Sequence, residues 1–388
     1  MKDAAAARLD ALIVLVHGAA QVLPALTPQN GATERARLID ALTRGQRVEP
    51  QFVYAPRKTE RVVHESLAAA RSLAHVSPAA ALYLARLDEL ELELRILEAI
   101  GDPRAVRPLA AQRYGTGAMS MTLGARTTTV AAAARDILAT TARPAPEPRT
   151  LPADDTRGGP SAAAIVREIA RAASVDVVVR VEPRLAAAAA SGERMVLLAA
   201  RSFGPREALR IAVHEVLGHL VSALNARVQP LRLLEIGTAN SFGDQEGVAL
   251  VLEEDVGVLD TGRVRTLAVR VLATDAMHAG MAFGDCALLL LRDHGLAPDA
   301  SIAVTERAFR GGGVARDAGY LRGWWHVRSA IAASMASIDE LRMGRVGVDD
   351  LDALRGLVSA GVLREGAYRP TIDAALRLAQ RAQLTGEA

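Results

Sequence analysis

Hydrophobic and polar positions follow a helical period through most of the first 140 residues. The clearest stretch is AALYLARLDELELELRILEAIG, residues 80–101, in which apolar residues recur at helical spacing and acidic residues fill the gaps. Gly101 provides a stop signal. The stretch from Glu49 to Pro56 contains two prolines and predicts an extended segment instead. The pattern therefore predicts an N-terminal helical region over residues 1–143.

A second region follows a segment rich in proline, glycine and charge. Residues 144–160, PAPEPRTLPADDTRGGP, have the composition of a linker or loop. Beyond them the pattern predicts a helix at 161–173, strands at 175–183 and 194–201, a long helix at 203–225, and mostly helical structure after Gln229. We therefore expect a mostly helical α+β protein whose second domain spans residues 161–388.

The composition of the chain limits which binding partners and which cellular compartment we expect. The chain has 388 residues and a formal net charge of +2, which gives no argument for binding nucleic acid or an anionic membrane. Its single cysteine, Cys286, lies in an apolar run and is interpreted as a core residue of a protein from a reducing compartment. The apolar N-terminal segment is interrupted by Asp10 and His17, so we expect neither a signal peptide nor a membrane span. These features predict a cytoplasmic protein and leave its oligomeric state open.

The stretch IAVHEVLGHLV, residues 211–221, holds the strongest candidate chemistry. Apolar residues surround His214, Glu215 and His219 on nearly every side of the predicted helix, which indicates a buried helix. Buried imidazole and carboxylate groups are costly unless they are paired or bind a metal. A bound metal would satisfy all three groups, whereas the alternative is a hydrogen-bonded pair of core histidines.

The two histidines are five residues apart, one more than in the zinc-peptidase pattern H-E-x-x-H. In a regular α-helix residues five apart point about 140° apart, so His214 and His219 would diverge. One additional residue in the turn, as in a π-bulge, restores their alignment. Gly218 lowers the steric cost of such a distortion. The spacing therefore predicts a local π-turn between the histidines.

A catalytic zinc ion takes three protein ligands and keeps one position for water, so a third ligand is needed. The segment FGDQEGVALVLEEDVG, residues 242–257, predicts a second buried helix. Glu246 lies in its first turn beside Gly247, which permits close approach, and is the favoured third ligand. Glu253 and Glu254 are the alternatives.

These motifs resemble those of a known family. HEVLGH, QPL at 229–231 and QEGVA at 245–249 are similar to the QEGLA-motif family, a domain of unknown function (1704) whose bacterial members are often labelled flavohaemoglobin-expression-modulating proteins. Its eukaryotic relatives are the microtubule-associated tyrosine carboxypeptidases, zinc enzymes that trim the C-terminus of α-tubulin. PQFVY (50–54), RYG (113–115) and FRGG…RDAGYLRG (309–323) also resemble family segments, so the resemblance extends over most of the chain.

The resemblance implies a role for each matching residue. The metal histidines fall on His214 and His219, the catalytic glutamate on Glu215, and the glutamate ligand on Glu246. The chain departs from the family pattern at Val248, where leucine is usual, and at Arg316, where lysine is expected. Dipeptidyl peptidase III has a similar hexapeptide, but its distant third-ligand segment has no counterpart here.

The expected chemistry is zinc-assisted peptide hydrolysis, with Glu215 as the general base for the attacking water. Tyr320, Arg310 and His326 are candidate donors to the oxyanion, although each is also explained by packing or surface exposure. Arg310 or Arg316 could bind the C-terminal carboxylate of a peptide or protein substrate, as in a carboxypeptidase.

The order of the predicted helices and strands indicates which fold the second domain adopts. A helix, two strands and a helix carrying His-Glu follow the order of half a zincin domain, a metallopeptidase fold, and residues 194–201 are expected to form an edge strand that could pair with a substrate. Two other functions remain open: a regulatory or binding protein on a zincin scaffold, and a zinc amidohydrolase acting on a small non-peptide amide. An intact Glu215 favours an enzyme over a binding protein.

Overall fold

The structure is a computed structural model of the chain and describes residues 2–124, 126–143, 149–154, 158–183, 185, 187–192 and 194–384. The chain forms two compact units. The first comprises Met1–Ala142 and Val264–Arg322, and the second Arg143–Arg263 and Gly323–Ala388. Residues 264–322, which the sequence pattern grouped with the second domain, thus belong to the first unit.

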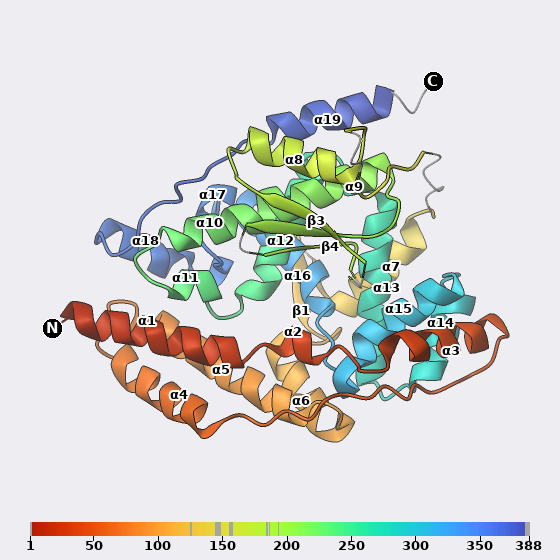
Figure 1. Cartoon of the computed structure of the whole chain (residues 1–388), viewed down its shortest axis with the longest axis horizontal. Helices are drawn as coiled ribbons and strands as arrows, with labels where there is room; N and C mark the ends of the chain where they lie inside the picture. The colour runs from red at the N-terminus through yellow and green to blue at the C-terminus, as the bar shows by residue number, and fades with distance from the viewer. Residues whose placement is uncertain are drawn as a thin grey trace. The chain divides into compact units, whose positions relative to one another are not determined.

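Helices dominate both units (Figure 1). The first unit contains α1 Lys2–Ala19, α2 Val22–Ala25, α3 Gly31–Thr43, α4 Arg61–Ala74, α5 Ala80–Ala99, α6 Pro103–Tyr114, β1 Ser120–Leu123, β2 Arg126–Thr129, α7 Val130–Thr140, α14 Phe283–Arg292, α15 Pro298–Phe309 and the 3₁₀ turn η2 Arg310–Gly312. The second contains α8 Ala162–Ala172, β3 Val178–Glu182, β4 Ala189–Ser191, β5 Met195–Ala199, α9 Pro205–Ala212, the π-helix η1 Val213–Leu220, α10 Val221–Arg227, α11 Leu233–Ile236, α12 Ser241–Asp255, α17 Ile338–Leu341, the 3₁₀ turn η3 Val348–Asp350, α18 Leu351–Ser359 and α19 Asp373–Leu384. Unit boundaries fall inside α13 Thr261–His278 and α16 Ala318–Ala332.

The first unit is mostly helical, as its apolar period predicts. The stretch around Tyr83 forms α5, which ends just before Gly101, a glycine with a φ of 95° that an L side chain rarely adopts. Residues 49–56 form neither a helix nor a strand of a sheet. The Asn30 side chain binds this segment by donating to the Gln51 carbonyl and accepting from the Val53 amide. The antiparallel hairpin of β1 and β2 was not predicted, because these short strands are rich in threonine and alternate little.

Cys286 is fully buried in a cluster of apolar residues from α13, α14 and α15. Burial raises the pKa of its thiol to about 11, so the thiolate is disfavoured at neutral pH. The interpretation of Cys286 as a core residue is confirmed.

The N-terminal segment differs from its prediction in one respect. Residues Ala4–Ala25 are long and apolar enough on average to cross a membrane, because alanine, leucine, valine and isoleucine outweigh the interruption at Asp10. Leu9, Ile13 and Val16 are buried, and Asp10 accepts a hydrogen bond from the Tyr83 hydroxyl at 2.6 Å. Core helices and signal sequences meet the same criterion of length and composition, so it does not by itself place the chain at a membrane.

The second unit contains a three-stranded sheet in the order β3-β5-β4, in which β3 runs parallel and β4 antiparallel to β5. The prediction that residues 194–201 form an edge strand is wrong, since β5 is central. The missed strand, β4, lies in an alanine-rich run, and its small residues carry no alternating pattern. The expectation of a mostly helical α+β fold is confirmed.

The predicted linker at 144–160 lies only in part within the described residues, because 144–148 and 155–157 fall outside them. In the remainder, Leu151 forms an isolated antiparallel bridge with Phe203. Ser161 then caps α8 by accepting a hydrogen bond from the Ala164 amide at 3.1 Å. Helix α8 begins where the sequence predicts and packs against α9 and η1.

Candidate metal centre

Helices α9, η1 and α10 follow one another without a break from Pro205, which occupies the first turn as predicted. The middle segment, η1, is a π-helix that contains both histidines of the motif. The Val221 amide donates to the carbonyl of Val216, five residues earlier, instead of to that of Leu217. The π-turn expected from the five-residue spacing is confirmed.

The π-turn brings two histidine nitrogens together. His214 Nε2 lies 3.1 Å from His219 Nε2. Glu246 Oε2, from α12, lies 3.4 Å from the first nitrogen and 3.7 Å from the second. Among the described residues these three side chains are the group of histidine, cysteine and carboxylate ligands that could hold a metal ion.

The spacing of these atoms suits a tetrahedral ion. Zinc bonds of about 2.0–2.2 Å at tetrahedral angles separate neighbouring ligand atoms by about 3.3–3.6 Å. The three observed separations of 3.1, 3.4 and 3.7 Å bracket that value. Glu246 Oε2 is buried and has no hydrogen-bond partner, a costly state that a bound cation would relieve. The residues present therefore fit a zinc ion.

Close packing of α12 carries Glu246 to the histidines. A Cβ atom on Gly218 would lie 2.8 Å from the Ala249 Cβ, so glycine lets η1 and α12 approach closely. On another side of α12, a Cβ atom on Gly247 would overlap with the Gly323 carbonyl of α16. The close approach expected at Gly247 is confirmed, and its partner is the backbone of α16.

Glu253, an alternative third ligand in the sequence analysis, lies on the other side of the His214 ring. Its Oε1 is 2.7 Å from His214 Nδ1, and its side chain is fully buried. Arg263 and Arg210 approach its two carboxylate oxygens at 3.4 and 3.8 Å. Glu253 can therefore fix the orientation and tautomer of His214, as carboxylates behind metal-binding histidines commonly do.

The other alternative, Glu254, faces elsewhere. It accepts a hydrogen bond from Trp324 Nε1 at 2.9 Å and lies 3.3 Å from the Arg328 guanidinium. Sequence reasoning missed Arg210 and Arg263. Arg210 could have been found, since it precedes His214 by four residues and so shares its helix face.

The charges of the site favour a cation. Burial lowers the pKa of His214, but the neighbouring carboxylates of Glu246 and Glu253 outweigh this and raise that pKa to about 9. Burial raises the pKa of Glu246, but the adjacent imidazoles of His214 and His219 prevail and hold that pKa well below its usual range. Carboxylates on both sides of His214 thus stabilise positive charge there, which a divalent ion would supply directly.

Glu215 follows the first histidine directly and is only 9% exposed. Its charge is one of those that raise the pKa of His214, so the two groups are close enough to interact electrostatically. Across the described part of the chain, no hydrogen bond or ion pair engages the Glu215 carboxylate. This carboxylate is therefore available to accept a proton from a substrate or a water molecule.

The two glutamines of the QPL and QEG segments have structural roles. Gln245 Nε2 donates to the carbonyls of Leu341 and Val346 at 3.0 and 2.9 Å. Gln229 Nε2 donates to the carbonyl of Met343 at 3.2 Å. Gln245 of α12 and Gln229, just after α10, therefore attach the end of α17 and the segment that follows it to the part of the chain that carries the candidate metal ligands.

His326, a candidate substrate-binding residue, points away from the candidate metal ligands. Its Nδ1 lies 2.8 Å from Asp244 Oδ1. Asp244 and Glu246 are two residues apart on α12, so their side chains leave the helix about 200° apart. His326 therefore lies on the face of α12 opposite to the one that presents Glu246, which a linear sequence cannot reveal.

Arg310, Arg316 and Tyr320 belong to the first unit, whereas the three candidate metal ligands belong to the second. Arg316 stacks over the Tyr114 ring at 5.1 Å, and Tyr320 forms a hydrogen bond with Arg307. Burial and then the nearby Arg307 lower the pKa of Arg310 to about 10. These residues form a basic cluster of their own within the first unit.

Comparison with known proteins identifies the class of this chain. It is a carboxypeptidase-like peptidase, because one carboxypeptidase family model matches residues 41–385. The chain belongs to that family, described as microtubule-associated tyrosine carboxypeptidase. The match confirms the relation to these carboxypeptidases and its extent over most of the chain. No curated protein matches the chain at a significant level.

Replacing Glu253 tests its role behind His214. Glu253→Gln should weaken zinc binding by about 10–100-fold, the usual cost of losing the outer partner of a metal-binding histidine. Competition with a chromophoric chelator measures this affinity. Glu254→Gln, the adjacent residue with other partners, is the matched control and should bind zinc like the wild type. Equal affinities in both variants would show that Glu253 does not support the site.

Proposed function

We propose that this protein is a zinc-dependent metallopeptidase with a zincin-like core that acts as a carboxypeptidase. The observation that carries the proposal is the convergence of His214 Nε2, His219 Nε2 and Glu246 Oε2 at separations of 3.1–3.7 Å. A buried carboxylate oxygen without a hydrogen-bond partner supports it, and so does membership of a carboxypeptidase family.

His214, His219 and Glu246 would hold the metal ion. When bound, zinc lowers the pKa of water and polarises the carbonyl of the scissile peptide bond. Glu215 acts as general base by accepting a proton from the attacking water, and then as general acid by passing that proton to the leaving amine. Glu253 keeps the His214 ring oriented through its Nδ1.

The proposed substrate is a peptide or protein with a free C-terminal carboxylate. The basic cluster that contains Arg310 and Arg316 supplies guanidinium groups of the kind that bind carboxylates through paired hydrogen bonds. Tyr320 is the proposed donor to the oxyanion of the tetrahedral intermediate. Disproof of either assignment would leave the proposal for the metal ligands unaffected.

A pool of peptides that end in each of the common amino acids tests the activity. The purified protein should shorten peptides with free C-termini, leave C-terminally amidated peptides intact, lose activity with a chelator, and regain it with added zinc. Mass spectrometry of the products reports each result. Cleavage of amidated peptides would contradict the carboxypeptidase assignment, and chelator-resistant cleavage would contradict zinc dependence.

A further inference from the structure

The π-turn between the histidines changes the hydrogen bonding of the helix backbone. In an α-helix the Leu217 carbonyl would accept from the amide of Val221, four residues later. Here the Val221 amide donates to Val216 instead. Arg342 Nη1 donates to the Leu217 carbonyl at 3.2 Å, and Ser222 Oγ donates to the next carbonyl, that of Gly218, at 2.9 Å. Two backbone carbonyls of the widened turn thus accept hydrogen bonds from side chains.

Arg342 is buried and held in place from several directions. It is only 2% exposed. Its Nη2 donates to Asp339 Oδ1 at 2.8 Å and to the Pro370 carbonyl at 3.3 Å. Its backbone carbonyl accepts from Asn225 Nδ2 at 2.7 Å, and Asn225 belongs to α10, just after the π-turn. A buried guanidinium is costly unless it is well bonded, and this one is bonded to the π-turn.

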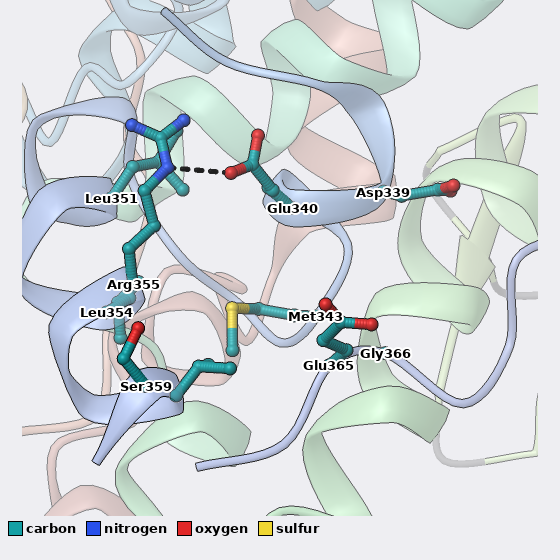
Figure 2. Close-up of a pocket in the computed structure, with 10 residues that line it drawn as sticks. Asp339, Glu340, Met343, Leu351, Leu354, Arg355, Ser359, Glu365 and Gly366 are labelled. Carbon is teal, nitrogen blue, oxygen red and sulfur yellow. Dashed lines mark hydrogen bonds and ion pairs between the residues drawn. The ribbon is translucent and has the colours of Figure 1, made fainter. Parts of the chain in front are cut away.

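Asp339 lies at the wall of a cavity of about 220 Å³ in the second unit. Figure 2 shows that it projects away from the ion pair of Glu340 and Arg355, two residues that also line the cavity. The side chains of that pair are joined at 2.7 Å, and among the described residues neither of these side chains is hydrogen-bonded to the Arg342 side chain. Arg355 is therefore a cationic neighbour of the same cavity that lacks the link to the π-turn.

We propose that Arg342 is a positioning residue for the metal centre, and this inference rests on the proposed function. By binding the Leu217 carbonyl, it stabilises the backbone register in which His219 faces His214. Without this donor, the carbonyl regains its preference for the Val221 amide and the turn shifts toward α-helical register. His219 would then point up to about 140° away from His214, and the three-ligand arrangement would be lost.

The test measures the zinc dissociation constant by chelator competition for the wild type, Arg342→Met, Arg342→Lys and Arg355→Met. Arg342→Met should bind zinc about 10–100-fold more weakly, as for the loss of other groups that orient metal ligands. Arg342→Lys retains one charged donor and should lose less. Arg355→Met, the control from the cavity wall, should match the wild type.

Two further readouts separate positioning from simple stabilisation. With Co²⁺ in place of zinc, the visible absorption of Arg342→Met should shift, because ligand geometry changes. Hydrogen exchange of peptides covering 213–222 should accelerate in the metal-free variant. A lower melting temperature with unchanged zinc affinity and an unchanged Co²⁺ spectrum would overturn the proposal.

Other outcomes are also decisive. If Arg342→Met does not fold, Arg342→Lys decides the matter: a weaker zinc affinity with an altered Co²⁺ spectrum supports positioning, and wild-type values for both overturn it. Failure of the wild type itself to bind zinc would refute the proposed function, and this inference with it. Equal zinc binding by the wild type and Arg342→Met would refute this inference alone.

Discussion

Glu215→Gln should lower kcat for C-terminal peptide hydrolysis by about 10²–10⁴-fold and leave the zinc content unchanged. The carboxylate is buried beside His214 and forms no hydrogen bond or ion pair in the described part of the chain, so its basicity is not used elsewhere. The amide has nearly the same size and cannot accept a proton. Steady-state kinetics on the best peptide, together with metal analysis of the same sample, give both numbers.

Glu235→Gln is the matched control for this experiment, because Glu235 is a partly buried glutamate of the same unit that forms an ion pair with Arg232 at 2.7 Å. It should retain wild-type kcat and zinc content. If Glu215→Gln lost zinc as well as activity, the carboxylate would be contributing to metal binding and not only to proton transfer. Full activity in Glu215→Gln would remove Glu215 from the mechanism.

The geometry of the candidate metal centre was largely predictable because its parts lie on two helices with local signals. The distance of five residues between His214 and His219 calls for a π-turn by helix geometry alone, and the structure contains one. Gly218 and Gly247 mark points where α12 and its neighbours approach closely. A glutamate next to such a glycine is well placed to reach the histidines, as Glu246 does.

Features that depend on distant partners were not predictable in this way. Strand β4 forms because β5 offers a free edge, and nothing in an alanine-rich run indicates that pairing. The direction of the His326 side chain depends on its contact with Asp244, a residue 82 positions earlier in the chain. Arg342 acts on Leu217 across 125 positions, and an arginine in a polar stretch gives no sign of burial.

Glu246→Ala should abolish stoichiometric zinc binding. The wild type should carry about one zinc per chain after purification without added metal, since two histidines and a carboxylate make a complete set of protein ligands for a catalytic site. Loss of a direct ligand should cost more than the roughly 10–100-fold typical of an outer partner, so the variant should retain little metal. Mass spectrometry for metals on both proteins measures this difference.

Thermal unfolding provides an independent readout of the same site. Zinc at 100 times its dissociation constant stabilises a protein by about 2.7 kcal/mol if it binds only the folded state. Wild type should therefore melt at a higher temperature with zinc than without, whereas Glu246→Ala should gain little from the same concentration. Glu254→Ala is the control, because Glu254 lies on the same helix but binds Trp324 and Arg328. It should respond to zinc as the wild type does.

Two outcomes of the metal analysis would contradict the assignment of Glu246. Equal zinc content in Glu246→Ala and wild type would mean that the third ligand lies elsewhere. Absence of zinc from both would mean that His214 and His219 are a buried pair of histidines without a metal.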